Sequence, residues 1–178
     1  NVTSYSNTGL ALVTSYNYTV AACDAAGNCS AQSAQVTAQT LDVTAPSVPA
    51  GLVASPVSAS QVDLSWNAAA DNLAVTAYKV YRGGSLVATL GNVTSYSDSG
   101  LQEITSYSYA VSACDAAGNC SAKSVAASAK TLDATAPTVP AGLVATAISP
   151  SKISLSWLAS TDNVAVTTYK LKRGGVLL

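Results

Sequence analysis

The chain has 178 residues, enough for one or two domains, and its eight basic and nine acidic side chains leave a formal net charge of −1. This near-neutral balance excludes an electrostatic argument for nucleic acid or an anionic membrane surface as a partner. The sequence has no histidine, which is the commonest general base and zinc ligand. No apolar run is close to the length of about 20 residues that a membrane-spanning helix needs.

The first predicted element is a strand over residues 15–20, where residue types alternate, followed by a five-residue turn sequence between Cys23 and Cys29. A hairpin with this loop places the two cysteines opposite each other at about 4.5–5.5 Å, within disulfide range. We therefore predict the disulfides Cys23–Cys29 and, where the motif recurs, Cys114–Cys120. The alternatives are reduced structural thiols and a zinc site, although zinc needs tighter spacing and usually a histidine. Disulfides indicate an oxidising compartment, outside the cell or in a periplasm.

Further along the chain, Pro46 and Pro49 predict a linker or a first edge strand. Seven short segments with strand character follow, over residues 51–55, 61–66, 77–82, 85–90, 93–97, 106–114 and 120–131. In the second of these segments, alternation places Val62, Leu64 and Trp66 on one face. Seven short strands in about 88 residues predict an all-β fold, a two-sheet sandwich.

The sequence repeats itself at a fixed offset of 91 residues, since Asn92 repeats Asn1 (92 − 1) and Cys114 repeats Cys23 (114 − 23). About 55 of about 87 aligned positions are identical. The repeat predicts the C-terminal half of a module over residues 1–41, a complete module over 46–133 and the N-terminal half of a further module over 137–178. Each half-module would expose its core face and its strand edges. We hypothesise a window of a longer array, or a filament unit completed head to tail by the next unit.

The complete module resembles the fibronectin type III domains of secreted bacterial proteins. The resemblance rests on the Pro-x-x-Pro-x-x-Leu opening, the Leu-Ser-Trp and Tyr-Lys-Val-Tyr-Arg segments and the hairpin loop, at residues 46–52, 64–66, 78–82 and 115–119. The chain departs from the family pattern in its cysteine pair and at residues 102–104, which lack the usual Pro and Gly. The resemblance implies tandem seven-stranded, immunoglobulin-like sandwiches. It also implies core tryptophans at Trp66 and Trp157, and tyrosine-corner residues, bonded to the backbone of the preceding loop, at Tyr16 and Tyr107.

Acidic residues recur in the linker before each module, in the loop after the Trp strand and in the hairpin loop. These candidate metal ligands are Asp42, Asp71, Asp115, Asp133 and Asp162. The sandwich topology gathers the linker and both loops at one pole. We interpret the carboxylates as turn caps and predict no cofactor. The alternative, which similarity to calcium-rigidified bacterial adhesin repeats suggests, is a calcium site that stiffens the joint between modules.

The acids are scattered one per loop, without a histidine or a free cysteine, so we predict that the chain is not an enzyme. We predict a structural or adhesive extracellular module, part of a stalk, fibre or filament shaft on a cell surface. Its partners would be neighbouring copies of itself or the continuing chain, without nucleic-acid binding or membrane insertion. The alternative is a spacer or accessory module of a secreted polysaccharide-degrading enzyme, and a third hypothesis is ligand binding through the polar loops.

Overall fold

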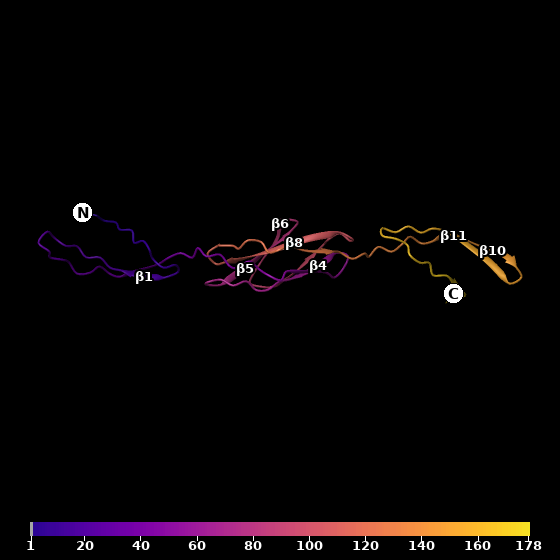
Figure 1. Ribbon diagram of the computed structural model, residues 1–178, viewed down its shortest axis with the longest axis horizontal. Coiled ribbons are helices and arrows are strands. Elements are labelled where there is room, and N and C mark those ends of the chain that lie inside the picture. The colour runs from indigo at the N-terminus through magenta and orange to yellow at the C-terminus, as the bar shows by residue number, and fades with distance from the viewer. Residues whose placement is uncertain (1) are drawn as a thin grey trace. The chain divides into compact units, whose positions relative to one another are not determined.

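A computed structural model describes residues 2–178, and Asn1, the first residue of the repeat, lies outside the described residues. Within this range the chain forms strands and loops (Figure 1), and no helix that could span a membrane is present. The strands are β1 (Ser15–Tyr18), β2 (Val36–Gln39), β3 (Val53–Pro56), β4 (Gln61–Ser65), β5 (Val75–Arg82), β6 (Ser85–Leu90), β7 (Ser95–Ser99), β8 (Ser106–Asp115), β9 (Ala127–Lys130), β10 (Ala141–Ser149), β11 (Lys152–Leu158), β12 (Lys172–Arg173) and β13 (Val176–Leu177).

The chain divides into two compact units. The first comprises the described part of Asn1–Val53 together with Ser65–Ser95 and Ser108–Ala127. The second comprises Ala54–Leu64, Tyr96–Tyr107 and Ser128–Leu178.

The larger sheet has the strand order β6-β5-β8-β9 and lies mostly in the first unit. β5 pairs antiparallel with both β6 and β8, and Val80 of β5 lies opposite Val111 of β8. Successive side chains of a strand point to opposite faces, so Tyr78 and Val80 share a face of β5, and Tyr109, Val111 and Ala113 share one of β8. All five side chains are buried, and they form the apolar core of this sheet.

The smaller sheet has the strand order β3-β4-β7 and lies mostly in the second unit. Val62 and Leu64 of β4 are buried, whereas Asp63 between them is half-buried and accepts a hydrogen bond of 2.8 Å from the side-chain amide of Gln61. The two sheets together contain seven strands, at the places where the sequence predicts them, with bounds that differ by a few residues.

The second arm of the disulfide hairpin differs from the prediction, because the expected strand over residues 120–131 is regular only in β9. Before β9, Ser121 and Ser124 interrupt the ladder. Their backbone N–H groups donate to Ala113 and Val111 of β8, but the backbone N–H groups of these two residues donate back to the serine hydroxyls, at 3.0 Å. A hydroxyl acceptor takes the place of a backbone carbonyl, and the segment is therefore no regular strand.

The copies at the two ends of the chain form smaller sheets than the central copy. β1 and β2 make a two-stranded sheet in which Ser15 lies opposite Gln39. β10 and β11 make another, with Val144 opposite Ser156, and β12 pairs with β13. All residues of these strands are exposed or half-buried, in contrast to β4, β5 and β8.

Candidate functional site

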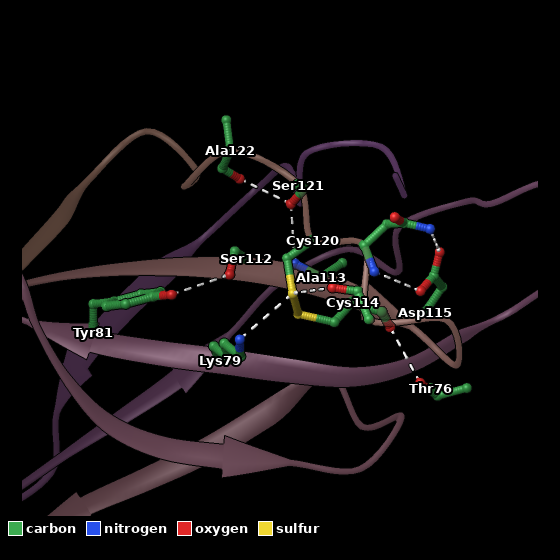
Figure 2. Close-up of a disulfide and its surroundings, with 12 residues drawn as sticks. Thr76, Lys79, Tyr81, Ser112, Ala113, Cys114, Asp115, Cys120, Ser121 and Ala122 are labelled. Carbon is green, nitrogen blue, oxygen red and sulfur yellow. Dashed lines mark hydrogen bonds between the residues drawn. A yellow bond between two sulfur atoms is a disulfide. The ribbon is translucent and has the colours of Figure 1, made fainter. Parts of the chain in front are cut away.

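Both predicted disulfides are confirmed, Cys23–Cys29 and Cys114–Cys120, with Cα–Cα distances of 4.0 and 4.1 Å. Figure 2 shows the second disulfide at the end of β8, where the Lys79 ammonium lies 3.5 Å from the sulfur of Cys120. No free cysteine occurs within residues 2–178. The described chain therefore offers neither a thiolate nucleophile nor a thiolate metal ligand.

The loop inside each disulfide is held by its aspartate. Asp115 accepts hydrogen bonds from the backbone and side-chain nitrogens of Asn119, at 2.8 and 2.7 Å (Figure 2), and Asp24 does the same with Asn28, at 2.8 and 2.9 Å. Burial alone would raise the pKa of Asp115, but the hydrogen bonds from Asn119 and the loop backbone outweigh it and hold that pKa below its usual range. Hydrogen bonds from Asn28 likewise lower the pKa of Asp24. Both carboxylates therefore favour the charged form.

Three acidic side chains of the first unit meet beside this loop, and we refer to Asp42, Asp71 and Asp115 as the acid cluster. One carboxylate oxygen from each lies within 4.8 Å of the other two. Asp42 lies in the linker, Asp71 follows β4 and Asp115 ends β8, so segments far apart in the sequence meet at this point. Asp115 is buried, and the other two carboxylates are half-buried.

Each carboxylate of the acid cluster also holds a turn. Asp42 accepts hydrogen bonds from the backbone of Thr44 and the amide of Asn72, at 3.0 and 3.1 Å. Asp71 accepts two backbone hydrogen bonds from the turn that follows it, at 3.1 and 3.2 Å. The second oxygens of Asp42 and Asp71 are buried without a hydrogen-bond partner. Carboxylate oxygens are suitable ligands for a hard cation, and turn capping equally accounts for the positions of these side chains.

The two remaining candidate ligands, Asp133 and Asp162, lie in the second unit. Asp133 accepts hydrogen bonds from the backbone of Thr135 and the side chain of Asn163, at 3.0 and 3.3 Å. Asp162 caps its turn through two backbone N–H groups, at 3.1 and 3.2 Å. These contacts repeat those of Asp42 and Asp71, but in the described chain no third carboxylate completes a group like the acid cluster.

Glu103 is a polar residue of the second unit that the sequence analysis did not identify as part of a site. Its carboxylate accepts hydrogen bonds from the Ala134 backbone at 3.0 Å, from the Thr135 hydroxyl, and from the Asn163 amide at 3.0 Å. The bonds from Thr135 and Ala134 hold the pKa of Glu103 below its usual range. The equivalent position of the preceding copy is Leu12, and this difference between copies was the signal available in the sequence.

The predicted core tryptophans have similar neighbours but different burial. Trp66 is 5% exposed, and its ring centroid lies 5.6 Å from that of Tyr78. Trp157 lies 5.4 Å from Tyr169 in the same tilted arrangement, but it is only half-buried. An aromatic pair of this kind is typical of a packed core.

The predicted tyrosine-corner residues also have equivalent contacts. The hydroxyl of Tyr107 accepts a hydrogen bond of 3.0 Å from the backbone of Gln102, and the hydroxyl of Tyr16 accepts one of the same length from Ala11. Both bonds return to the loop that precedes the tyrosine, as in the tyrosine corner of related sandwiches.

No protein-family model matches the chain. Exoglucanase B of Cellulomonas fimi is 46% identical over 172 residues, which cover 90% of this chain and 16% of that protein. Chitinase A1 of Niallia circulans is 46% identical over 142 residues, covering 77% of this chain and 20% of that protein. An alpha-amylase of Niallia circulans is 53% identical over 90 residues, covering 51% of this chain and 7% of that protein. The chain therefore spans a fifth or less of the length of these relatives.

Solved structures are similar to the chain as well. The chicken CNTN1 FN1-FN3 domains superpose with a TM-score of 0.50 at 19% identity, covering 72% of this chain and 46% of that one. A Fn3-like protein from Clostridium thermocellum is 32% identical, covering 52% of this chain and 99% of that one, with a TM-score of 0.43. The similarity to the CNTN1 domains concerns the fold alone, and it confirms the predicted all-β sandwich class.

Proposed function

We infer that this chain, whose fold is the fibronectin type III β-sandwich, is a non-catalytic spacer or accessory module of a secreted polysaccharide-degrading enzyme. One observation carries the inference: similar segments occur in proteins named for different reactions, an exoglucanase, a chitinase and an alpha-amylase. The shared segment makes up a fifth or less of each protein. Because the substrates named differ while the segment is shared, we place substrate choice and bond cleavage outside it.

The carboxylates of the chain support a non-catalytic role. Glycoside hydrolysis commonly uses two carboxyl groups on either side of the scissile bond, about 5–10 Å apart, and one of them is a general acid with a raised pKa. The acid cluster instead brings one carboxylate oxygen from each of three residues within 4.8 Å of the other two. The pKa of Asp115 is lowered rather than raised, which is unfavourable for a general acid.

An extracellular location fits both the proposed enzyme and the covalent structure of the module. Glucan and chitin are polymers too large to enter a cell, so an enzyme that degrades them works outside it. Disulfides persist in such oxidising surroundings, and both hairpins of this chain are closed by one. The spacer role requires no cofactor.

The internal repeat favours a second candidate function, the shaft of a stalk, fibre or filament. Repeats that contact only their neighbours add length without enlarging a core. The 91-residue repeat supports this function, whereas the enzyme relatives support the spacer.

The test begins with the sequence of the full polypeptide that contains this chain. We expect a glycoside-hydrolysing domain in it, and a polypeptide made only of further copies would contradict the spacer and favour the shaft. In that enzyme, residues 46–133 are then replaced by a flexible Gly/Ser linker of equal length. A spacer predicts unchanged turnover of a soluble oligosaccharide and severalfold slower degradation of the insoluble polymer. Loss of activity on both substrates would instead assign the module to the catalytic machinery.

A further inference from the structure

Five positions of the sequence begin the pattern Asn-x-Ser/Thr, which is the acceptor motif for N-linked sugars. They are Asn1, Asn17, Asn28, Asn92 and Asn119. The first lies outside the described residues, and the structure distinguishes the other four. A glycosylated asparagine needs a side-chain amide that is exposed and free of other hydrogen bonds, because the sugar is bulky and the amide nitrogen is the reacting atom.

The two motifs in the hairpin loops have no free amide. The side-chain nitrogen of Asn119 donates to the carboxylate of Asp115 at 2.7 Å and to the backbone carbonyl of Asp42 at 3.3 Å. The side-chain nitrogen of Asn28 donates to the carboxylate of Asp24 at 2.9 Å. The middle residue of each motif is a disulfide cysteine, and the serine hydroxyl that ends each motif is hydrogen-bonded to the backbone. Both motifs are therefore already used to build their loops.

The third motif lies within a sheet. Asn17 belongs to β1, and its side-chain carbonyl accepts a hydrogen bond of 2.6 Å from the hydroxyl of Thr37 on the facing strand. The counterpart of Asn17 in the central copy is Ser108 of β8, a strand with a neighbour on each side. A paired strand holds its backbone extended, so this motif cannot bend into the active site of a transferase without losing the pairing.

Asn92 lies in the turn between β6 and β7, in the central copy, whose seven strands are all present. Residues 91–95 are exposed. The backbone N–H of Val93 donates to the carbonyl of Gly91 at 2.8 Å, so Asn92 is the central residue of a three-residue turn. A Cβ atom added at Gly91 would meet nothing within 4 Å, and the space around the turn is open. Within residues 2–178, neither the amide of Asn92 nor the hydroxyl of Thr94 has a hydrogen-bond partner.

We propose that Asn92 is a glycosylation site, at which a transferase attaches a sugar from a glycosyl diphosphate donor. The amide nitrogen attacks C1 of the sugar and forms the N–C1 bond. The bond between C1 and the diphosphate oxygen breaks, and its electron pair leaves with the diphosphate. A base of the transferase takes one proton from the amide nitrogen. The modification does not depend on the proposed spacer role.

The test is mass spectrometry of the protein purified from the organism that produces it. Trypsin cleaves after Arg82 and Lys123, so the peptide 83–123 contains both Asn92 and Asn119. Fragmentation that keeps sugars attached should place a sugar on Asn92 and none on Asn119. An unmodified Asn92 would overturn the proposal, and so would a sugar attached to a serine or threonine hydroxyl of this peptide in its place.

Variants made in the same organism test the motif itself. Thr94→Ala keeps the asparagine but removes the hydroxyl that ends the motif, and we expect the sugar to be lost. Thr94→Ser keeps a hydroxyl there and should keep the sugar. The matched control is Thr89→Ala, at an exposed threonine outside the motif, which should leave the modification unchanged. A Thr94→Ala protein that still carries the sugar would contradict the proposal.

The mass of the attached group distinguishes the two sources of the donor. A lipid-linked donor delivers a preassembled oligosaccharide, so the peptide gains several sugar residues together. A nucleotide-linked donor delivers one sugar residue at a time, so peptides with a single residue should be present. Either result supports the site, and a peptide 83–123 that carries no sugar at all contradicts it.

Discussion

Glu103 of the central copy and Asn163 of the following copy are joined by a hydrogen bond of 3.0 Å between a carboxylate oxygen and a side-chain amide. The same carboxylate accepts bonds from Ala134 and Thr135 in the intervening linker. One side chain therefore holds both the linker and the next copy. The preceding linker has no such contact, because Leu12 occupies the equivalent position.

Replacing Glu103 by Leu, the residue of the equivalent position, should loosen this joint. We expect the Ala134 amide to exchange its hydrogen severalfold faster, since its acceptor at 3.0 Å is removed. Amide exchange followed by nuclear magnetic resonance measures this rate. Leu12→Ala is the control, and it should leave exchange at Ala134 unchanged. Equal exchange in the Glu103→Leu variant and the unmodified chain would show that the contact does not hold the linker.

Low pH should break the same contact between Glu103 and the linker. Hydrogen bonds from Thr135 and Ala134 keep the pKa of Glu103 below its usual range. A carboxylate whose pKa is lower in the folded than in the unfolded chain stabilises the folded state at any pH above the unfolded-state pKa. This stabilisation is lost as the pH falls through the folded-state pKa. We therefore expect the contact to persist at neutral pH and to be lost below about pH 4.3. The chemical shift of the Glu103 carboxyl carbon, followed as a function of pH, measures this transition. A midpoint above about pH 4.3 would contradict the prediction.

Removing the disulfide of the central copy should destabilise the fold. Closing a loop with a sequence separation of 6 restricts the unfolded chain and contributes about 2 kcal/mol to the free energy of unfolding. We expect the Cys114→Ser, Cys120→Ser double variant to lose about that amount in urea unfolding. The matched control is the Cys23→Ser, Cys29→Ser double variant, which should have little effect on the urea unfolding of the central copy. An unchanged midpoint for the first variant would show that the loop is already restricted in the unfolded state.

The two copies of one valine offer a matched test of burial. Val111→Ala removes buried methyl groups and should lower the free energy of unfolding by about 2 kcal/mol. Val20→Ala changes a side chain that is 71% exposed and should have little effect. Urea unfolding of both variants measures the difference. Similar losses in the two variants would mean that the side chain of Val20 is buried.

Metal removal should leave the stability unchanged. Asp42 and Asp71 each hold a turn through one oxygen, and Asp115 is bonded to Asn119, so hydrogen bonds within the chain fix the loops. We expect the same melting temperature in excess chelator and in millimolar calcium. Asp71→Asn is the control, because it removes one of the three neighbouring carboxylates of the acid cluster. A calcium-dependent rise in melting temperature that this variant abolishes would assign the cluster to a cation.

The sequence by itself determined the local features. Cys114 and Cys120 flank a five-residue turn, so their pairing follows from short-range geometry, and the all-β class follows from alternation and turn spacing. Asp115 holds a loop whose members lie within four residues of it. Such features depend on neighbours in the chain, and a sequence displays those neighbours directly.

Only the tertiary structure decided how far each strand extends and which apolar faces are covered. Residues 2–6 and 93–97 have the same sequence, but Ser95–Ser99 forms β7 beside β4, whereas residues 2–6 form no strand. A strand needs a partner for its backbone hydrogen bonds, and the partner is distant in the sequence. The contacts of Glu103 could not be predicted from the sequence for the same reason, because its partners Ala134 and Asn163 lie 31 and 60 residues away along the chain.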